Sequence, residues 1–125
     1  MKLMGLPNFF IGTDIVEVDR INKLLQRTGE LFKNKVFTTL EKNYCDSKSS
    51  PAIHFAGRFA AKESIIKAIK SSGYKNPIPF KDIEILPSNS GVPIVDIHFE
   101  LECDCKVSIS HTESHAVATA LYIQK

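Results

Sequence analysis

The segment FAGRFAAKESIIKAIK, residues 55–70, has the most regular apolar periodicity in this chain of 125 residues. At about 100° per residue, one face of a helix would collect four apolar side chains, namely Phe55, Phe59, Ile66 and Ile69. The run Ser71-Ser72-Gly73 supplies a stop signal directly after it. We therefore predict a long helix over Phe55–Lys70 as the central element of the fold.

Charged residues interrupt the apolar face of this predicted helix. Lys62 falls in the middle of the apolar stripe, with Glu63 on one flank and Arg58 on the other. A charged pair that faces inward from a helix is costly unless a partner or a ligand compensates it. Two interpretations stay open: a functional site, or an ordinary surface. On such a surface Glu63 pairs with Lys67, and the Lys62 ammonium reaches solvent past its apolar neighbours.

Upstream, FFIGTDI at residues 9–15 predicts a buried strand in which Gly12 permits close approach of another backbone. Asp14 lies inside this strand, where an unpaired carboxylate would be expensive. It could cap the following helix or pair with Arg20. It could also share a Mg²⁺ ion with Glu63, because magnesium takes one or two carboxylates together with substrate phosphates. Nearby lysines would then neutralise phosphate charge.

The remaining patterns complete a fold prediction. Thr38 to Glu41 matches a capping box, and helices come early in the chain while strands come late. This order favours an α+β fold with an antiparallel sheet packed with one long helix and several short ones, in a single domain over residues 1–125. The other predicted elements are helices from about Asp19 to Thr28 and from Thr39 through Tyr44, a loop at Asp46–Pro51, and strands at Asp82–Ile85, Ile94–Leu101, Val107–Ser110 and Ala116–Ile123.

Composition excludes several classes of protein. Apolar residues make up 43% and charged residues 24% of the chain, which argues against wholesale disorder. No run approaches the ~18 consecutive apolar residues of a membrane span, so we expect no membrane partner. Met1–Pro7 lacks the apolar stretch of a signal peptide. Three cysteines do not form a disulfide framework, so we expect a reducing, cytoplasmic location.

Charge is distributed unevenly along the chain. Residues 1–81 contain 14 Lys or Arg against 7 Asp or Glu, a balance of +7, whereas residues 82–125 contain 2 against 7, a balance of −5. A basic front favours an acidic partner or a phosphorylated ligand, although most of these lysines would be ordinary solvated residues. The isoelectric point of 8.4 is below that typical of nucleic-acid-binding domains, so we expect no nucleic-acid partner.

His111 ends the predicted strand Val107–Ser110 and is followed by Thr112. A histidine at a strand end can donate to a phosphate or move a proton, and it can equally be an ordinary turn residue. Cys103 and Cys105 could suggest a zinc site with nearby histidines, but their spacing does not match a structural zinc motif. Because the two cysteines share the parity of the apolar strand positions, we expect them to face the core.

Three segments of the chain together resemble the holo-acyl-carrier-protein synthases, the small single-domain group of 4′-phosphopantetheinyl transferases. They are IGTDIVEVDRI at 11–21, FAGRFAAKES at 55–64 and VSISHT at 107–112. Weaker similarities occur at residues 37–41, 82–85 and 91–93. The match covers nearly the whole chain in the expected order, so the combination is far more specific than any one motif.

This resemblance implies an activity and an assembly. The enzyme would transfer the 4′-phosphopantetheine arm of coenzyme A to a serine of an acyl carrier protein and release adenosine 3′,5′-bisphosphate, a step in fatty acid biosynthesis. It would be a homotrimer with active sites between subunits.

The resemblance also assigns roles to residues. It implies Asp14 and Glu63 as Mg²⁺ ligands, Lys62 and Lys67 as lysines near the phosphates, Arg58 and His111 as residues of the coenzyme A pocket, and Arg20 as a contact to the acidic carrier protein. The group that takes the serine proton stays open among Glu63, a water on the metal and Lys62. Residues 49–54, SSPAIH, stand where the family often has basic side chains.

A rival interpretation belongs to a different class of protein. The chain could be a non-enzymatic ligand-binding or regulatory α+β domain in which Asp14 and Glu63 form structural ion pairs with Arg20 and Lys67. Metal dependence separates the two interpretations, because a structural ion pair should be indifferent to chelation.

Overall fold

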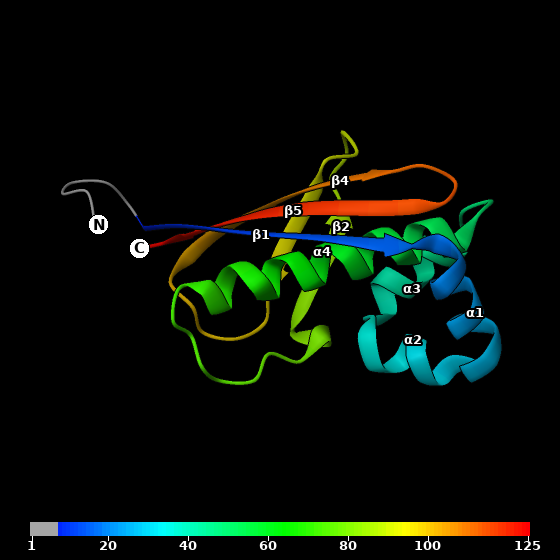
Figure 1. Ribbon diagram of the computed structural model, residues 1–125, viewed down its shortest axis with the longest axis horizontal. Helices are drawn as coiled ribbons and strands as arrows, with labels where there is room; N and C mark the ends of the chain where they lie inside the picture. The colour runs from blue at the N-terminus through cyan, green and yellow to red at the C-terminus, as the bar shows by residue number, and fades with distance from the viewer. Residues whose placement is uncertain (1–7) are drawn as a thin grey trace.

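A three-stranded sheet packed on one long helix forms the body of the protein (Figure 1). The computed structural model describes residues 8–125, so Met1–Pro7 and the signal-peptide argument made for it lie outside the described residues. Strands β1 (Asn8–Glu17), β4 (Cys103–His111) and β5 (His115–Gln124) pair antiparallel in the order β1-β5-β4. Helix α4 (Pro51–Ser71) runs along one face of this sheet. The predicted α+β class with an antiparallel sheet is confirmed.

Three short helices gather near one end of α4 (Figure 1). They are α1 (Val18–Thr28), α2 (Glu30–Val36) and α3 (Thr39–Asp46). The predicted capping box is present before α3: the Thr38 hydroxyl accepts from the Glu41 backbone N–H, and the Glu41 carboxylate accepts from the Thr38 N–H. Helix α2 was not predicted, because its seven residues are too few to display a helical period.

The long helix starts earlier than the sequence pattern indicated. Pro51 stands at its first turn, so the predicted Asp46–Pro51 loop ends at Ser50. Proline is well suited there because the first turn of a helix has backbone N–H groups without intrahelical acceptors. Within residues 8–125, no helix combines the length and the hydropathy that a membrane crossing requires.

A two-stranded ribbon lies beside the main sheet. It consists of β2 (Ile83–Pro87) and β3 (Pro93–Ile97), and a short 3₁₀ turn at Phe80–Asp82 precedes it. The strand predicted over Ile94–Leu101 is therefore too long at its C-terminal end. Strand β4 is longer than the predicted strand Val107–Ser110, because its pairing with β5 extends to Cys103, which lies opposite Gln124.

Strand β1 is buried on one face only, which corrects the prediction of a fully buried strand. Gly12 and Val16 face α4 and are buried, whereas three apolar side chains point outward with large exposed fractions: Phe9 at 53%, Ile11 at 67% and Ile15 at 66%. On the neighbouring strand β5, Val117 lies opposite Ile15 and is 38% exposed. An apolar stripe thus runs along the outer face of the sheet.

The backbone of β1 touches the backbone of α4 at Gly12, as the sequence predicted. A Cβ atom added at Gly12 would overlap the carbonyl oxygen of Ser64 and would lie 2.8 Å from the amide nitrogen of Ala68. Both atoms belong to a helix backbone, which cannot move aside without displacing the whole element.

Gly12→Ala is expected to lower the free energy of unfolding by about 2 kcal/mol or more, because the added methyl forces strand and helix apart. Chemical denaturation measures this loss. The matched control is Gly57→Ala, whose added Cβ would lie 3.2 Å from the flexible Ile109 side chain. Equal losses in the two variants would contradict the assigned importance of the Gly12 contact.

Candidate active site

Asp14 and Lys67 meet between the sheet and the long helix. Lys67 Nζ lies 3.1 Å from Asp14 Oδ1 and donates to the Thr13 carbonyl oxygen at 3.0 Å. The Asp14 side chain is 18% exposed, whereas that of Lys67 is 53% exposed. The pairing predicted as an alternative, Asp14 with Arg20, is absent from the ion pairs of residues 8–125, and so is Glu63 with Lys67.

Glu63 adds a second carboxylate to this site. Partial burial raises the pKa of Glu63, and the nearby negative charge of Asp14 raises it further, while Lys67 and Arg20 act in the opposite direction. Two neighbouring carboxylates that repel each other form a donor set suited to a hard divalent cation such as Mg²⁺. The residues present therefore fit the metal that the sequence resemblance implies.

Lys62 lies in the core of the protein and contacts none of these groups. Its ammonium pairs with Glu41 Oε1 at 2.7 Å and donates to the carbonyl oxygens of Val36 at 2.7 Å and Phe80 at 3.0 Å. The side chains of Lys62 and Glu41 are both fully buried. The prediction that Lys62 faces inward is confirmed, and the alternative of an ammonium in solvent is wrong. Its hydrogen bonds are those of a structural residue rather than of one near a phosphate.

Arg58 and His111, both predicted to line a ligand pocket, belong to a cluster of cationic and aromatic side chains. The Arg58 guanidinium carbon lies 4.3 Å from the Tyr44 ring centroid, and Lys48 Nζ lies 4.8 Å from it. His54 links the two predicted residues: its ring packs edge-on against Tyr44 at 5.9 Å and against His111 at 6.1 Å. We call these five residues, Tyr44, Lys48, His54, Arg58 and His111, the cationic cluster.

Arg20 lies on the exposed side of α1, apart from the cationic cluster. Its guanidinium carbon is 6.0 Å from the Phe59 ring centroid. A shallow groove on this helix is lined by three basic, two acidic and one apolar residue, namely Arg20, Lys23, Arg27, Glu17, Asp19 and Leu24. Basic side chains on an exposed helix are available to an acidic partner.

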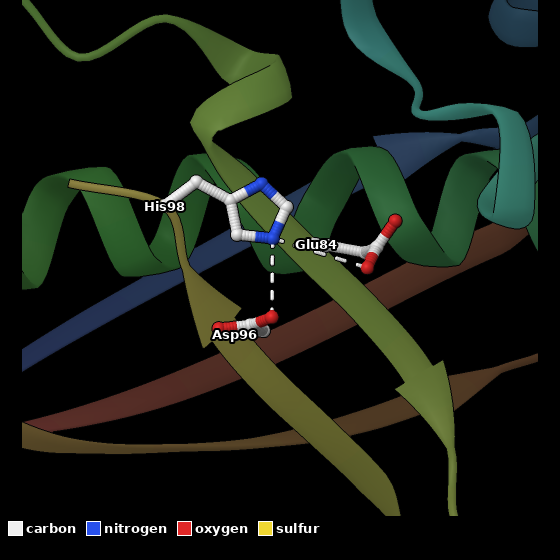
Figure 2. Close-up of side chains that lie close together, drawn as sticks. All are labelled: Glu84, Asp96 and His98. Carbon is white, nitrogen blue, oxygen red and sulfur yellow. Dashed lines mark hydrogen bonds and ion pairs between the residues drawn. The ribbon is translucent and has the colours of Figure 1, made fainter.

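A separate group of titratable side chains lies on the β2–β3 ribbon (Figure 2). Glu84 and Asp96 stand opposite each other in register, and His98 Nε2 lies 3.1 Å from Asp96 Oδ2 and 3.9 Å from Glu84 Oε1. The second carboxylate oxygen of Glu84 accepts from the Thr38 hydroxyl. Within residues 8–125 this is the one group of three or more potential metal-ligating residues whose ligand atoms gather within 4.8 Å, and it includes no cysteine. Its carboxylates already have protein partners, and it lies on the other sheet from Asp14.

Several functional neighbours were missed at the sequence level. His54 and Tyr44 carried a detectable signal, because each lies about one helical turn from a charged neighbour, Arg58 and Lys48 respectively. No sequence signal marked Glu41 as a core residue, because the capping box already explained its carboxylate. Its pairing with Lys62 joins residues 21 positions apart and depends on tertiary packing.

Comparisons with known proteins show what the chain is similar to. Residues 10–120 match the family model described as the 4′-phosphopantetheinyl transferase superfamily. The chain is 45% identical over 112 residues to the holo-[acyl-carrier-protein] synthase of Chlorobaculum parvum, covering 89% of this chain and 95% of that relative. It is 40% identical over 116 residues to the synthase of Protochlamydia amoebophila, covering 90% and 94%.

Two solved structures share the fold over nearly their whole length. The ACPS–CoA complex of Chronobacterium ammoniagenes superposes with a TM-score of 0.83 at 29% identity, covering 94% of this chain and 98% of that one. The holo-(acyl-carrier-protein) synthase of Bacillus anthracis, in complex with CoA (3′,5′-ADP), superposes with a TM-score of 0.79 at 33% identity, covering 93% and 96%.

Proposed function

Because this chain belongs to the 4′-phosphopantetheinyl transferase superfamily, we propose that it is a holo-acyl-carrier-protein synthase. It transfers 4′-phosphopantetheine from coenzyme A to a serine of an apo-acyl carrier protein and releases adenosine 3′,5′-bisphosphate. The observation that carries the proposal is the meeting of Asp14, Glu63 and Lys67 in a chain whose relatives are synthases. We assign the step to fatty acid biosynthesis, and the cytoplasmic location expected from the sequence stays a prediction.

Asp14 and Glu63 are the residues that would hold Mg²⁺. Bound there, the metal would neutralise charge that develops on the pyrophosphate of coenzyme A. Lys67 is exposed enough to exchange part of its contact with Asp14 for a contact with a phosphate oxygen. A carboxylate pair beside one mobile ammonium suits a reaction centred on phosphate.

The chemical step exchanges the phosphoanhydride bond of coenzyme A for a phosphoester bond to serine. The serine oxygen bonds to the phosphorus that carries the pantetheine arm, and the bond from that phosphorus to the leaving adenosine bisphosphate breaks. The serine proton needs an acceptor, and we propose the carboxylate of Glu63 for that role, because it lies at the site and is ionised when it holds a metal. Lys62 has no part in this step, because its ammonium is enclosed by Glu41 and two carbonyl groups.

Arg58 and His111 are proposed contacts to coenzyme A. Arg58 is 7% exposed and His111 is exposed, so the pair offers one fixed and one accessible donor. Guanidinium groups bind phosphate oxygens through paired hydrogen bonds, and a ring N–H of His111 adds a further donor.

Arg20→Glu is expected to raise the KM for the carrier protein by roughly tenfold at low salt while leaving the affinity for coenzyme A unchanged, because charge on α1 guides an acidic partner. Steady-state kinetics at several salt concentrations measure the effect. The matched control is Lys81→Glu, a charge reversal at an exposed residue outside α1. An unchanged KM at low salt would remove Arg20 from the docking surface.

The exposed apolar stripe on β1 supports the proposal of a homotrimer. Isolated apolar residues are common on protein surfaces, but several exposed apolar side chains on one face of a strand, here interrupted only by Thr13, are typical of an interface. The stripe borders a groove lined by Ile15, His111 and Val117 among others, so a neighbouring subunit seated on it would also approach the proposed active site.

Ile11→Glu is expected to convert trimers to monomers at micromolar concentration, because burying the introduced charge in an apolar interface is unfavourable. Light scattering coupled to size-exclusion chromatography reports the mass. Ile94→Glu, at a similarly exposed position on β3, serves as the control. A trimer that survives Ile11→Glu would exclude this stripe as the interface.

The proposed function as a whole is tested by mass spectrometry. Apo-acyl carrier protein incubated with coenzyme A, Mg²⁺ and the enzyme should gain the mass of one phosphopantetheine group, and the gain should vanish with EDTA. The rival function, a non-enzymatic domain with structural ion pairs, predicts no mass gain under any condition.

A further inference from the structure

The cationic cluster holds positive charge without negative partners. None of Lys48, His54, Arg58 and His111 forms an ion pair with a carboxylate in residues 8–125. Lys48 and Arg58 instead lie over the ring of Tyr44. The ring of His54 packs against the rings of Tyr44 and His111. The permanent charges of this group, those of Lys48 and Arg58, therefore lie without a carboxylate partner, and a bound anion would stabilise them.

Arg58 makes the strongest case for an anionic ligand. Its side chain is more than nine-tenths buried, yet its Nε atom has no hydrogen-bond partner. An unsatisfied buried donor on a charged group costs free energy that a ligand oxygen would recover. The position of the guanidinium carbon over the Tyr44 ring, 4.3 Å from its centroid, holds the group beside the other cationic side chains.

His54 is the titratable residue at the centre of this cluster. It stands where the family often has a basic side chain, between the rings of Tyr44 on α3 and His111 on β4. Lys48, from the segment after α3, and Arg58, one turn along α4, supply the remaining charges near it. We propose that His54 takes up a proton when the cationic cluster contacts a phosphate group of coenzyme A. This inference rests on the proposed function.

Electrostatics gives the direction of this coupling. Burial lowers the pKa of His54 below its usual value, and the charges of Arg58, His111 and Lys48 lower it further. In the free protein near pH 7, His54 is therefore neutral. A bound phosphate would reverse the sign of the local potential and raise the pKa, so the protonated imidazole would form with the complex. The affinity for coenzyme A should therefore increase as the pH falls from 8 towards 6. Below the pKa of His54 in the free protein, the affinity should no longer depend on pH through this residue.

Titration calorimetry of coenzyme A binding tests the coupling. Measured near pH 7 in two buffers that differ in ionisation enthalpy, the apparent binding enthalpy should differ by the proton uptake multiplied by that difference. We expect a clear uptake of part of one proton by the wild type. The metal is kept constant at saturating Mg²⁺, so that changes at Asp14 and Glu63 do not enter the comparison.

Two substitutions at the same position separate charge from titration. His54→Gln should abolish most of the proton uptake and weaken binding by roughly tenfold near pH 6, with a smaller effect near pH 8. His54→Arg supplies a permanent charge and should bind coenzyme A without proton uptake. His98→Gln, in the group on the β2–β3 ribbon, is the matched control and should retain the wild-type uptake.

The outcomes distinguish this inference from the proposed function. Failure of the wild type to bind coenzyme A would overturn the proposed function and the inference with it. Binding without proton uptake, or uptake that persists in full in His54→Gln, would overturn the role of His54 alone. Thermal melts of each variant confirm that it is folded before the calorimetry is compared.

Discussion

Asp14→Asn and Glu63→Gln are each expected to lower kcat by at least about a hundredfold while the protein stays folded. Both replacements keep the shape of the side chain and remove the charge that would hold Mg²⁺. The raised pKa of Glu63 shows that its ionised form is disfavoured in the folded state, so its contribution to stability increases as the pH falls. Replacement by a neutral amide should therefore leave the metal-free protein as stable as the wild type, or slightly more stable.

The control for this prediction uses the other group of carboxylates. Asp96→Asn, on the β2–β3 ribbon in Figure 2, should retain nearly full activity and full Mg²⁺ dependence. Loss of the Mg²⁺ response in Asp96→Asn would show that the functional metal binds at the β2–β3 ribbon instead. Thermal melts with EDTA and with Mg²⁺ complete the test. A large destabilisation of Asp14→Asn in EDTA, together with a wild type indifferent to Mg²⁺ in the presence of coenzyme A, would return Asp14 to the role of a structural ion pair.

Lys62→Met is expected to lower the free energy of unfolding by about 3–5 kcal/mol, because it leaves the Glu41 carboxylate charged and buried without its cation. Both side chains are fully buried, and the ammonium also satisfies the last carbonyl of α2 and the carbonyl of Phe80. Urea denaturation monitored by circular dichroism measures the loss.

A double variant distinguishes charge from packing at this pair. In Lys62→Met combined with Glu41→Gln, no charge remains, and the introduced amide oxygen can still accept from one of the backbone N–H groups that Glu41 serves, those of Thr38 and Ile85. We expect the double variant to recover at least half of the stability lost by Lys62→Met alone. Equal losses in the single and double variants would show that packing rather than an unpaired charge causes the effect.

The sequence predicted the central helix and its buried charge, but not the partner of that charge. Lys62 stood within an apolar stripe, and a helical period of 3.6 is enough to place it on the inner face. Glu41 is on another helix, and its role in the capping box was enough to explain a glutamate at that position. Nothing in the local sequence indicated a second partner for its carboxylate. Pairing between elements depends on how they pack, which a period along one element does not encode.

The sequence likewise indicated some residues of the candidate site and not others. Asp14 was recognisable because a carboxylate in an apolar strand violates the pattern around it, and Glu63 because it flanks an apolar face. His54 had only a weak signal, its spacing of four residues from Arg58, and its position between Tyr44 and His111 emerged only from the structure. Strand β1 was predicted to be buried because its outward residues are apolar too, and the fold of one chain covers only one of its two faces.

The contact at Gly12 fixes the alignment of strand β1 along helix α4, and the active site forms only in that alignment. Residues on a strand alternate between faces, so sliding β1 by one residue would turn Asp14 outward and bring an isoleucine or threonine to face α4. Only a residue without a side chain fits against Ser64, and β1 has one glycine. The strand can therefore dock in one position along the helix, and that position also brings Asp14 to Lys67. Mutations that loosen this docking should produce enzymes that are folded yet catalytically heterogeneous, a mixture of aligned and misaligned molecules rather than a uniformly slower population.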